Sequence, residues 1–298
     1  MRRSGLAVTG TRRRSVGLAM LLLTGCATTS PEQASHRERL STAAQECQRR
    51  YPFVMRVDFD RFDRLTWLYR EGATQSDRDA FTECYRVRVQ ELTTGASAHG
   101  STGQPGGTPS APSATADAGV AAVEVPVWKP GFEWEYRQES PRGRGTFKWT
   151  MTREETVDGT PCYVVWSGPL ELYWRVSDLA SVLSKRLAQV ETRYAPPRLN
   201  LVWPLAVGRS WEQLTVQERP QERKSSNLLR TWQVERMESV TVPAGTFRAW
   251  KVVSRDKWAN SVVWEYWYAP DVRNLVRSRE TPSYGGETRE LIRFTLGD

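Results

Sequence analysis

The chain has 298 residues, of which 39% are hydrophobic and 26% are charged, with a formal net charge of +8. This length allows one large or two modest domains, and the composition excludes a multi-span membrane protein and a disordered or collagenous chain. Five arginines and no acid precede residue 26, so the rest of the chain carries a charge of only about +3 and nucleic-acid binding has little support.

The first 25 residues are predicted to be an export signal. Arg12–Arg14 precede an apolar run from Val16 to Leu23, and small residues follow this run. A basic segment, a short apolar segment and a small-residue cleavage site are typical of secretory signals. The apolar run has eight residues, which is too short to span a bilayer, since a spanning helix needs about 20.

The segment Leu23-Thr24-Gly25-Cys26 resembles the lipobox of bacterial lipoproteins. The resemblance implies that Cys26 becomes the new amino terminus and accepts the lipid, with palmitate-type acyl chains. Each buried methylene contributes about 0.8 kcal/mol, so two or three chains anchor a protein stably in a membrane. Ala27 stands where an aspartate would imply inner-membrane retention, so the resemblance implies an anchor in the outer membrane, facing the periplasm or, as the alternative, the cell surface. The alternative is an ordinary cleaved signal with a coincidental cysteine.

Residues 26–92 are predicted to form a small domain built as an α-helical hairpin. Apolar residues recur at helical spacing in three groups, Leu40-Ala43-Ala44-Cys47, Phe62-Leu65-Tyr69 and Phe81-Cys84-Tyr85-Val89-Leu92. Ser76, with Asp79 three residues later, predicts a helix start, and Gly95 predicts the end of that helix.

The cysteines that follow Cys26 are expected to be structural. Cys47 and Cys84 lie on the apolar stripes of two predicted helices, so we expect a disulfide between them in an oxidising compartment. No Cys-x-x-Cys spacing indicates a redox function. Cys162 is expected to be unpaired and buried as a small hydrophobic residue.

Residues 93–124 are predicted to be a flexible linker, and residues 125–298 a tryptophan-rich β domain. The linker consists mainly of Gly, Ser, Thr, Ala and Pro. The β domain holds twelve of the thirteen tryptophans, and its large side chains alternate with polar ones, as in Phe132-Glu133-Trp134-Glu135-Tyr136. Alternation with a period of two is typical of antiparallel strands with one buried face.

The β domain is predicted to contain two copies of one meander, over residues ~128–201 and ~203–297. Trp149, Arg153 and Glu155 recur 83 residues later as Trp232, Arg236 and Glu238, and further matches keep the same order. Two meanders of roughly five strands each can form a curved sheet or barrel, or can face each other as a sandwich. The alternative is chance similarity among tryptophan-rich strands.

Two segments, Val240–Phe247 and Tyr266–Val272, resemble a recurrent β domain of uncharacterised bacterial envelope proteins. The resemblance covers residues ~200–280 and implies a strand, a Pro-Ala-Gly turn and a second strand. Pro243 and Gly245 suit such a turn. Asn274 stands near a position where the family carries glycine, so the turn after Val272 is expected to differ. The family carries no assigned activity.

Residues 125–298 offer few groups for chemistry. They contain no histidine, so no catalytic triad and no histidine-based metal site is expected there, and we expect no cofactor. His36 and His99 are expected to be solvated. A carboxylate pair remains as a candidate for glycan hydrolysis, and the candidate carboxylates are Glu154, Glu155, Asp158, Asp178 and Asp271.

Four aromatic residues of the β domain are candidates to face a ligand, namely Trp174, Trp264, Tyr266 and Trp267. Around Val263–Tyr268 large aromatics point to both faces of the predicted sheet, which indicates one packed face and one face offered to a ligand or partner. The alternative is that they only fill a β core. The sequence therefore favours a non-catalytic envelope lipoprotein that binds an apolar or amphiphilic ligand or an envelope protein, with a carboxylate-dependent cell-wall hydrolase as the second hypothesis.

Overall fold

The structure is a computed structural model that describes residues 30–60, 64–98, 122–257 and 260–297. These residues contain two helices, α1 (Pro31–Arg50) and α2 (Gln75–Ala98), and two strands between them, β1 (Val54–Phe59) and β2 (Leu65–Tyr69). The remaining strands are β3 (Glu133–Ser140), β4 (Gly143–Val157), β5 (Thr160–Ser167), β6 (Leu170–Arg175), β7 (Ser181–Arg186), β8 (Gln189–Arg198), β9 (Ser210–Arg219), β10 (Lys224–Val242), β11 (Gly245–Asp256), β12 (Val262–Ala269), β13 (Asn274–Glu280) and β14 (Thr288–Thr295).

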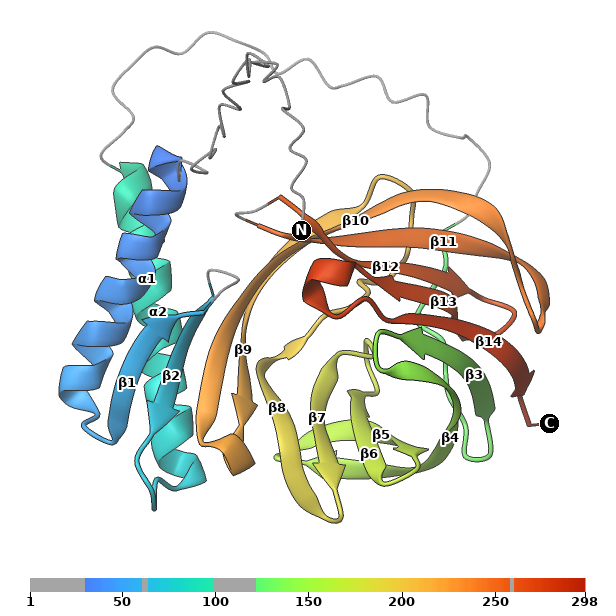
Figure 1. The fold of residues 1–298 in the computed structure, drawn as a ribbon, viewed down its shortest axis with the longest axis horizontal. Helices are drawn as coiled ribbons and strands as arrows, with labels where there is room; N and C mark the ends of the chain where they lie inside the picture. Colours follow the sequence, from blue (N-terminus) through green and yellow to red (C-terminus); the bar gives the residue numbers. More distant parts are fainter. Residues whose placement is uncertain (1–29, 61–63, 99–121, 258–259, 298) are drawn as a thin grey trace, which may run out of the picture.

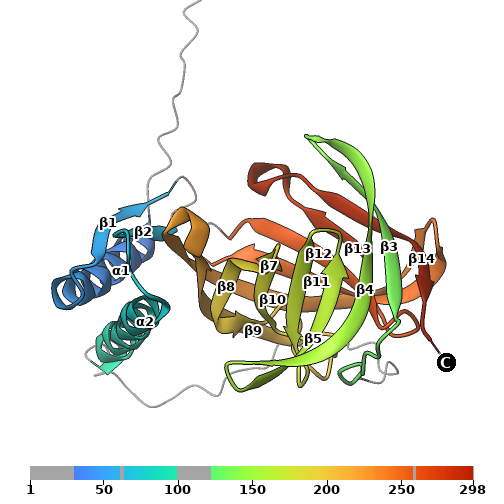
Figure 2. The same ribbon diagram turned by 90° about the horizontal axis from the view of Figure 1, so that it is seen from below.

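Strands β3 to β14 form a closed antiparallel barrel of twelve strands (Figure 1). Each strand pairs with the next one in the chain, and the pairing of β14 with β3 completes the ring. The barrel alternative of the sequence analysis is therefore confirmed, and the sandwich is excluded. Closure gives every one of these strands two neighbours, so the barrel leaves no free sheet edge. Figure 2 shows the ring from below, with the strands strongly curved.

The predicted boundary between the two meanders falls between β8 and β9. Six strands precede it in the barrel and six follow it, instead of the roughly five expected for each copy. The predicted Pro-Ala-Gly turn joins β10 to β11, where Val242 pairs with Gly245. After Val272, Arg273 takes a left-handed conformation with φ 54°, and β13 begins at Asn274.

The segment between the two helices is a β-hairpin, so the helical stripe expected at Phe62, Leu65 and Tyr69 is wrong. Leu65, Trp67 and Tyr69 are buried on one face of β2, while Phe62 lies outside the described residues. Leu65 and Tyr69 are four residues apart, a spacing that fits a helix turn and also two strand repeats. Pairing of β2 with the first residues of β10 selects the strand.

Both ends of α2 differ from the expectation. Thr74 and Asp77 cap its start: the Asp77 carboxylate accepts from the Thr74 amide at 2.8 Å, and the Thr74 hydroxyl accepts from the Asp77 amide at 3.1 Å. Ser76, expected to start the helix with Asp79 three residues later, is already inside it. Thr74 and Asp77 have the same spacing two residues earlier and form the cap instead. The helix also continues through Gly95 to Ala98, so the predicted linker begins too early.

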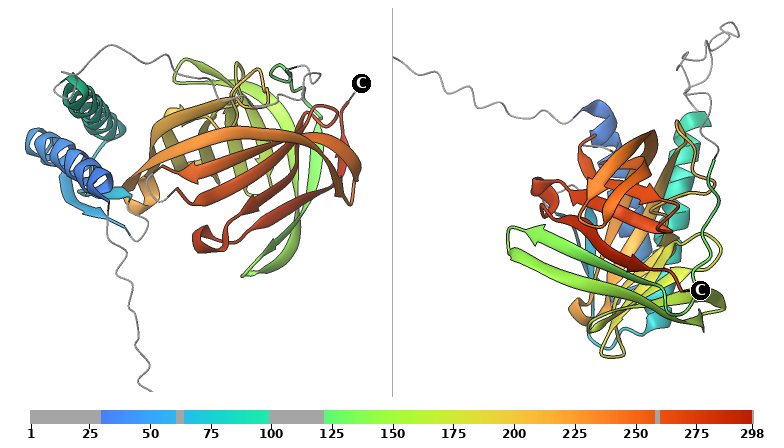
Figure 3. Two further views of the ribbon diagram at one scale, coloured as in Figure 1. Left: turned by 90° about the horizontal axis from the view of Figure 1, so that it is seen from above. Right: turned by 90° about the vertical axis from the view of Figure 1, so that its right-hand side faces the viewer.

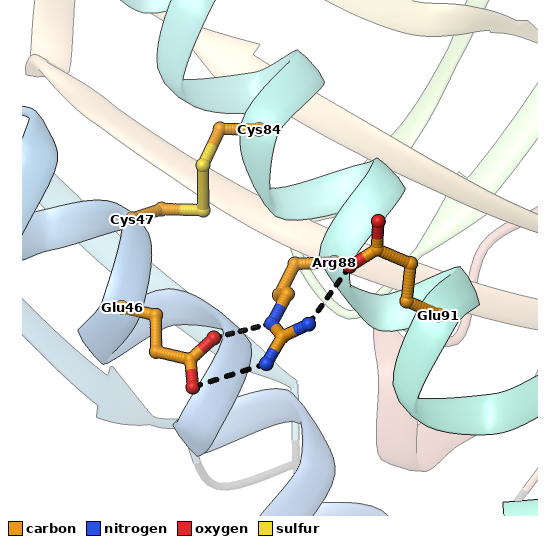
Figure 4. Close-up of a disulfide and its surroundings, with 5 residues drawn as sticks. All are labelled: Glu46, Cys47, Cys84, Arg88 and Glu91. Carbon is orange, nitrogen blue, oxygen red and sulfur yellow. Dashed lines mark hydrogen bonds and ion pairs between the residues drawn. A yellow bond between two sulfur atoms is a disulfide. The ribbon is translucent and has the colours of Figure 1, made fainter. Parts of the chain in front are cut away.

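A disulfide joins α1 to α2, as expected, between Cys47 and Cys84, whose Cα atoms are 6.0 Å apart (Figure 4). One turn further, Arg88 of α2 bonds to Glu46 of α1 and to Glu91, the latter at 2.8 Å. Figure 3 shows the two helices side by side at one end of the barrel.

The helices and the β1–β2 hairpin share a hydrophobic core with the barrel wall. Leu40, Trp67, Phe81 and Tyr85 form its centre, and Val216 of β9 packs into it. Glu218, two residues further along β9, is fully buried and accepts hydrogen bonds from Gln75 and Thr82 of α2. The first three residues of β10 pair with both β9 and β2, so one sheet runs from the hairpin into the barrel.

The expectation for Cys162 is confirmed, and the expectation for His36 is wrong. Cys162 is a free, fully buried cysteine, as expected. His36, expected to be solvated, is only 6% exposed, because it faces the barrel side of α1 near Lys257.

The export signal, Cys26, His99 and most of the predicted linker lie outside the described residues. Among the helices in the described ranges, none has the length and apolar character needed to cross a membrane.

Candidate functional site

A cavity of about 270 Å³ lies inside the barrel, between β3, β4 and β6–β8 on one side and β12–β14 on the other. Most of its lining is aromatic or aliphatic. The lining residues of this kind are Trp128, Tyr136, Phe147, Trp149, Leu172, Tyr173, Trp174, Leu179, Leu183, Tyr194, Leu201, Trp264, Tyr266, Tyr268 and Leu275. Ligand sites in proteins are typically concave, mainly apolar and equipped with few polar groups. This cavity has that character.

Strand alternation places most of these rings in the interior, where they contact one another; Tyr173, next to Trp174 on β6, instead directs its hydroxyl to Glu171 at 3.2 Å. On one side, Trp174 lies between Trp128 and Trp149, with ring centroids 6.1 and 6.0 Å away. On the other side, Tyr266 stacks on Trp264 at 5.7 Å and on Trp232 at 5.8 Å. Tilted and offset ring pairs at these distances are favourable, so the aromatic walls are preorganised.

Three of the four predicted ligand-facing aromatics, Trp174, Trp264 and Tyr266, line this cavity. Trp267 does not. Its neighbours on β12, Tyr266 and Tyr268, point into the cavity, so Trp267 points to the opposite face of the strand. There its indole N–H donates to the Glu238 carboxylate at 2.5 Å.

Four tyrosines of the lining stay protonated over the physiological range. Burial raises the pKa of Tyr136, Tyr173, Tyr266 and Tyr268 above the ordinary value of 10. The Tyr136 hydroxyl donates to the Leu275 carbonyl at 2.9 Å, which joins β3 to β13 across the wall of the cavity. These groups therefore contribute neutral hydroxyls and not negative charge.

The charged part of the lining is entirely basic. Arg198, Arg273 and Arg289 contribute to it, and no aspartate or glutamate does. Glu280 lies close to the lining. It pairs with Trp264 in the sheet, and its charge raises the pKa of Tyr266. Burial and the neighbouring Glu287 raise the pKa of Glu280 to about 7, so this side chain is partly neutral at physiological pH.

Four buried polar atoms of the lining residues have no hydrogen-bond partner among the described residues. They are Trp174 Nε1, Arg198 Nε, Asn200 Oδ1 and Asn274 Nδ2. Native proteins satisfy most buried polar groups, so a group of unsatisfied atoms around one cavity calls for an explanation. An ordered water or a ligand with polar atoms would satisfy them.

The five candidate carboxylates do not meet at this cavity, and none of them lines it. Asp178 bonds to Arg175 at 2.6 Å, and Asp158 bonds to Arg193 at 2.7 Å. Glu155 pairs with Arg153 at 2.7 Å, which holds the pKa of this carboxyl below its ordinary value. Glu154 and Asp271 are exposed. Within the described ranges, no group of three or more His, Cys, Asp or Glu residues is arranged to hold a metal ion.

Sequence patterns do not mark the polar residues of the cavity, in particular Arg198, Asn200 and Asn274. Tyr194 and Arg198 lie in the second half of β8, which also contains Pro196 and Pro197. These prolines interrupt the alternation of apolar and polar side chains that would mark β8 in the sequence. No local pattern marks an arginine as lumen-facing before the ring is closed.

Comparisons with known proteins give similarity in structure only. The chain matches no protein-family model, and no curated protein matches its sequence. Among solved structures, it is similar to a Bacteroides fragilis protein provisionally described as an exported protein with a YmcC-like fold, at 13% identity and a TM-score of 0.35, over 59% of this chain and 100% of the other.

Two further solved structures show similar values. A Parabacteroides distasonis protein provisionally described as a lipoprotein has 12% identity and a TM-score of 0.30, over 59% of this chain and all of the other. The hypothetical lipoprotein YmcC of Escherichia coli has 10% identity and a TM-score of 0.30, over 54% of this chain and 84% of the other.

Proposed function

We propose that this chain is a non-catalytic, lipid-anchored protein of the bacterial envelope whose barrel binds an apolar or amphiphilic ligand. The observation that carries the proposal is the cavity of about 270 Å³ with its aromatic lining. A β core built only for stability is packed without voids of this size, since a single buried methylene-sized gap already costs about 1 kcal/mol. The anchor at Cys26 and the location in the outer membrane follow from the lipobox resemblance.

The alternative of a carboxylate-dependent glycan hydrolase has less support. A hydrolytic pair needs two carboxyl groups about 5–10 Å apart that face the same substrate. Asp158 and Asp178 each bind an arginine instead, and neither lines the cavity. A second partner, an envelope protein that docks on the barrel, is compatible with ligand binding in the cavity.

Quenching of tryptophan fluorescence tests ligand binding directly. The full chain carrying Cys26→Ser, which cannot be acylated, is titrated with the neutral probe 8-bromooctanol, whose bromine quenches nearby indoles. We expect saturable quenching that decreases in Trp264→Phe, because Trp264 lines the cavity. Trp166→Phe is the matched control, since Trp166 is 50% exposed and lies outside the lining.

A substitution that fills the cavity should weaken this binding. Ser278 is 4% exposed and lines the cavity, so Ser278→Phe should displace about two methylenes of a bound chain. At about 0.8 kcal/mol each, this corresponds to a Kd about tenfold higher. Unsaturable quenching that is equal in all variants would show that the cavity does not bind the probe and would refute the proposed function.

A further inference from the structure

We infer that the cavity takes an acidic amphiphile, a short apolar chain with one anionic oxygen-bearing head group, and that Arg198 binds this head group. The inference rests on the proposed function and names the class of its ligand. It is argued from the charge of the lining, from the free donors and from the size of the cavity.

The lining has three arginines and no acid, but two of the arginines have partners. Arg273 donates to the Val127 carbonyl at 3.1 Å, and Arg289 is bonded to the Glu287 carboxylate. Arg198 differs from both, because neither a carbonyl nor a carboxylate of the described residues pairs with its guanidinium, and its Nε atom is buried without a partner. A partly buried guanidinium without an anionic partner is costly in a closed barrel, and an anion in the cavity would relieve this cost.

The surroundings of Arg198 hold the guanidinium in place for such an anion. Its planar group lies over the Tyr194 ring, 4.6 Å from the ring centroid, which orients it without using its N–H donors. The Nε atom is buried and has no hydrogen-bond partner among the described residues. Arg198 pairs with Ser181 across β7 and β8, and Asn200, which is 8% exposed, donates to the Ser181 hydroxyl at 3.0 Å.

Three of the four unsatisfied atoms of the lining are donors. They belong to Arg198, Trp174 and Asn274, and Asn274 is only 6% exposed. An excess of buried donors favours a ligand rich in acceptors, as a carboxylate or phosphate is. Arg198 and Arg289 lie on opposite walls of the barrel. The charge of each lowers the pKa of Tyr266, which burial raises, so both charges act on the same part of the cavity.

The size of the cavity limits the ligand. At about 30 Å³ for each water-sized group, 270 Å³ accommodates about nine such groups. An eight-carbon chain with its head group is therefore a suitable probe, and longer chains would have to extend beyond the cavity.

Competition against 8-bromooctanol tests this inference with matched compounds. Octanoate and octyl phosphate have anionic head groups, and octanol has the same chain without charge. We expect at least one anion to displace the probe about tenfold to a hundredfold better than octanol, the range for a hydrogen bond to a charged group. Arg198→Gln should abolish this preference and leave displacement by octanol unchanged, whereas Arg198→Lys should keep most of it.

Arg193→Gln is the matched control on the same strand, because Arg193 bonds to Asp158 at 2.7 Å and lies outside the lining. It should keep the preference for the anion. If octanol competes as well as both anions, or if Arg198→Gln keeps the preference in a folded protein, the inference is wrong while the proposed function stands. If 8-bromooctanol itself does not bind, both are wrong. A preference for octanoate over octyl phosphate, or the reverse, identifies the head group.

Discussion

His36 lies on the buried face of α1, where burial together with Arg39 and Lys257 lowers the pKa of its imidazole from 6.5 to about 4. Since the folded protein binds this proton less well than the unfolded chain, the neutral form of His36 favours folding. The stabilisation is fully present above pH 6.5 and is lost as the pH falls through 6.5 toward 4.

We therefore expect acid to destabilise the wild-type chain more than His36→Gln. Between pH 7.5 and 4.5 the additional loss should be about 2–3 kcal/mol, since each unit of pKa difference corresponds to 1.36 kcal/mol. Glu280, with its pKa raised to about 7, acts in the opposite direction between pH 7 and 4.5, but equally in both proteins. Urea unfolding at the two pH values measures the difference, and equal losses in the two proteins would contradict this assignment.

Cys162 is also buried, and burial makes its thiol unreactive. Burial raises the pKa of its thiol to about 11, so little thiolate forms at physiological pH. A thiolate is the reactive form of cysteine. The free cysteine in the barrel therefore fits a packing role and not a redox one.

Two cross-links join α1 to α2. The disulfide between Cys47 and Cys84 closes a loop with a sequence separation of 37, and Arg88 adds a polar link between the helices. In the chain-entropy model a loop of this length stabilises the folded state by on the order of 3–4 kcal/mol.

Removal of this disulfide should loosen the helices more than the barrel. We expect Cys47→Ala with Cys84→Ala to lower the free energy of unfolding of the helical part by about 3–4 kcal/mol, measured by thermal unfolding in the far ultraviolet. Dithiothreitol should have the same effect on the wild-type chain and none on the double variant. Cys162→Ala is the control that leaves the disulfide intact, and a reductant effect that persists in the double variant would refute the attribution.

The long strand β10 connects the β1–β2 hairpin to the barrel. β10 has 19 residues, of which the first ten pair with β9 and the last twelve or so with β11. Its first residues also pair with β2 on the other side. A hairpin of two short strands has little stability by itself, so the barrel stabilises β1 and β2.

The described residues form a closed ring with a helical unit on β9, and the proposed lipid anchor at Cys26 stands five residues before α1 in the sequence. Closure brings β8 opposite β12–β14, which places Arg198 and the aromatic row of Tyr266 around one space.

The membrane fraction in which the protein is found tests the lipid anchor proposed at Cys26. We expect the wild-type chain to fractionate with the outer membrane and to carry palmitate, because three acyl chains retain a protein stably where one does not. Cys26→Ser should release the exported protein into the soluble fraction, and Ala27→Asp should shift it to the inner membrane. Mass spectrometry that finds an unmodified Cys26 in the membrane fraction would refute lipidation.

Several features of this protein follow from local sequence. The alternation around Phe132–Tyr136 predicts strands, the Pro243–Gly245 turn predicts the β10–β11 hairpin, and the apolar stripes at Cys47 and Cys84 predict their disulfide. Each of these signals lies within a few residues, because side-chain period and turn chemistry are local properties.

Other features depend on contacts between distant segments. Leu65 and Tyr69 fit a helix or a strand, and only pairing with β10 selects the strand. The interior position of Arg198 and the outward position of Trp267 depend on the direction in which the sheet curves and closes. Closure joins β14 to β3, whose residues are about 150 positions apart in the chain, and no local pattern of side chains encodes which face of a strand will enclose the cavity.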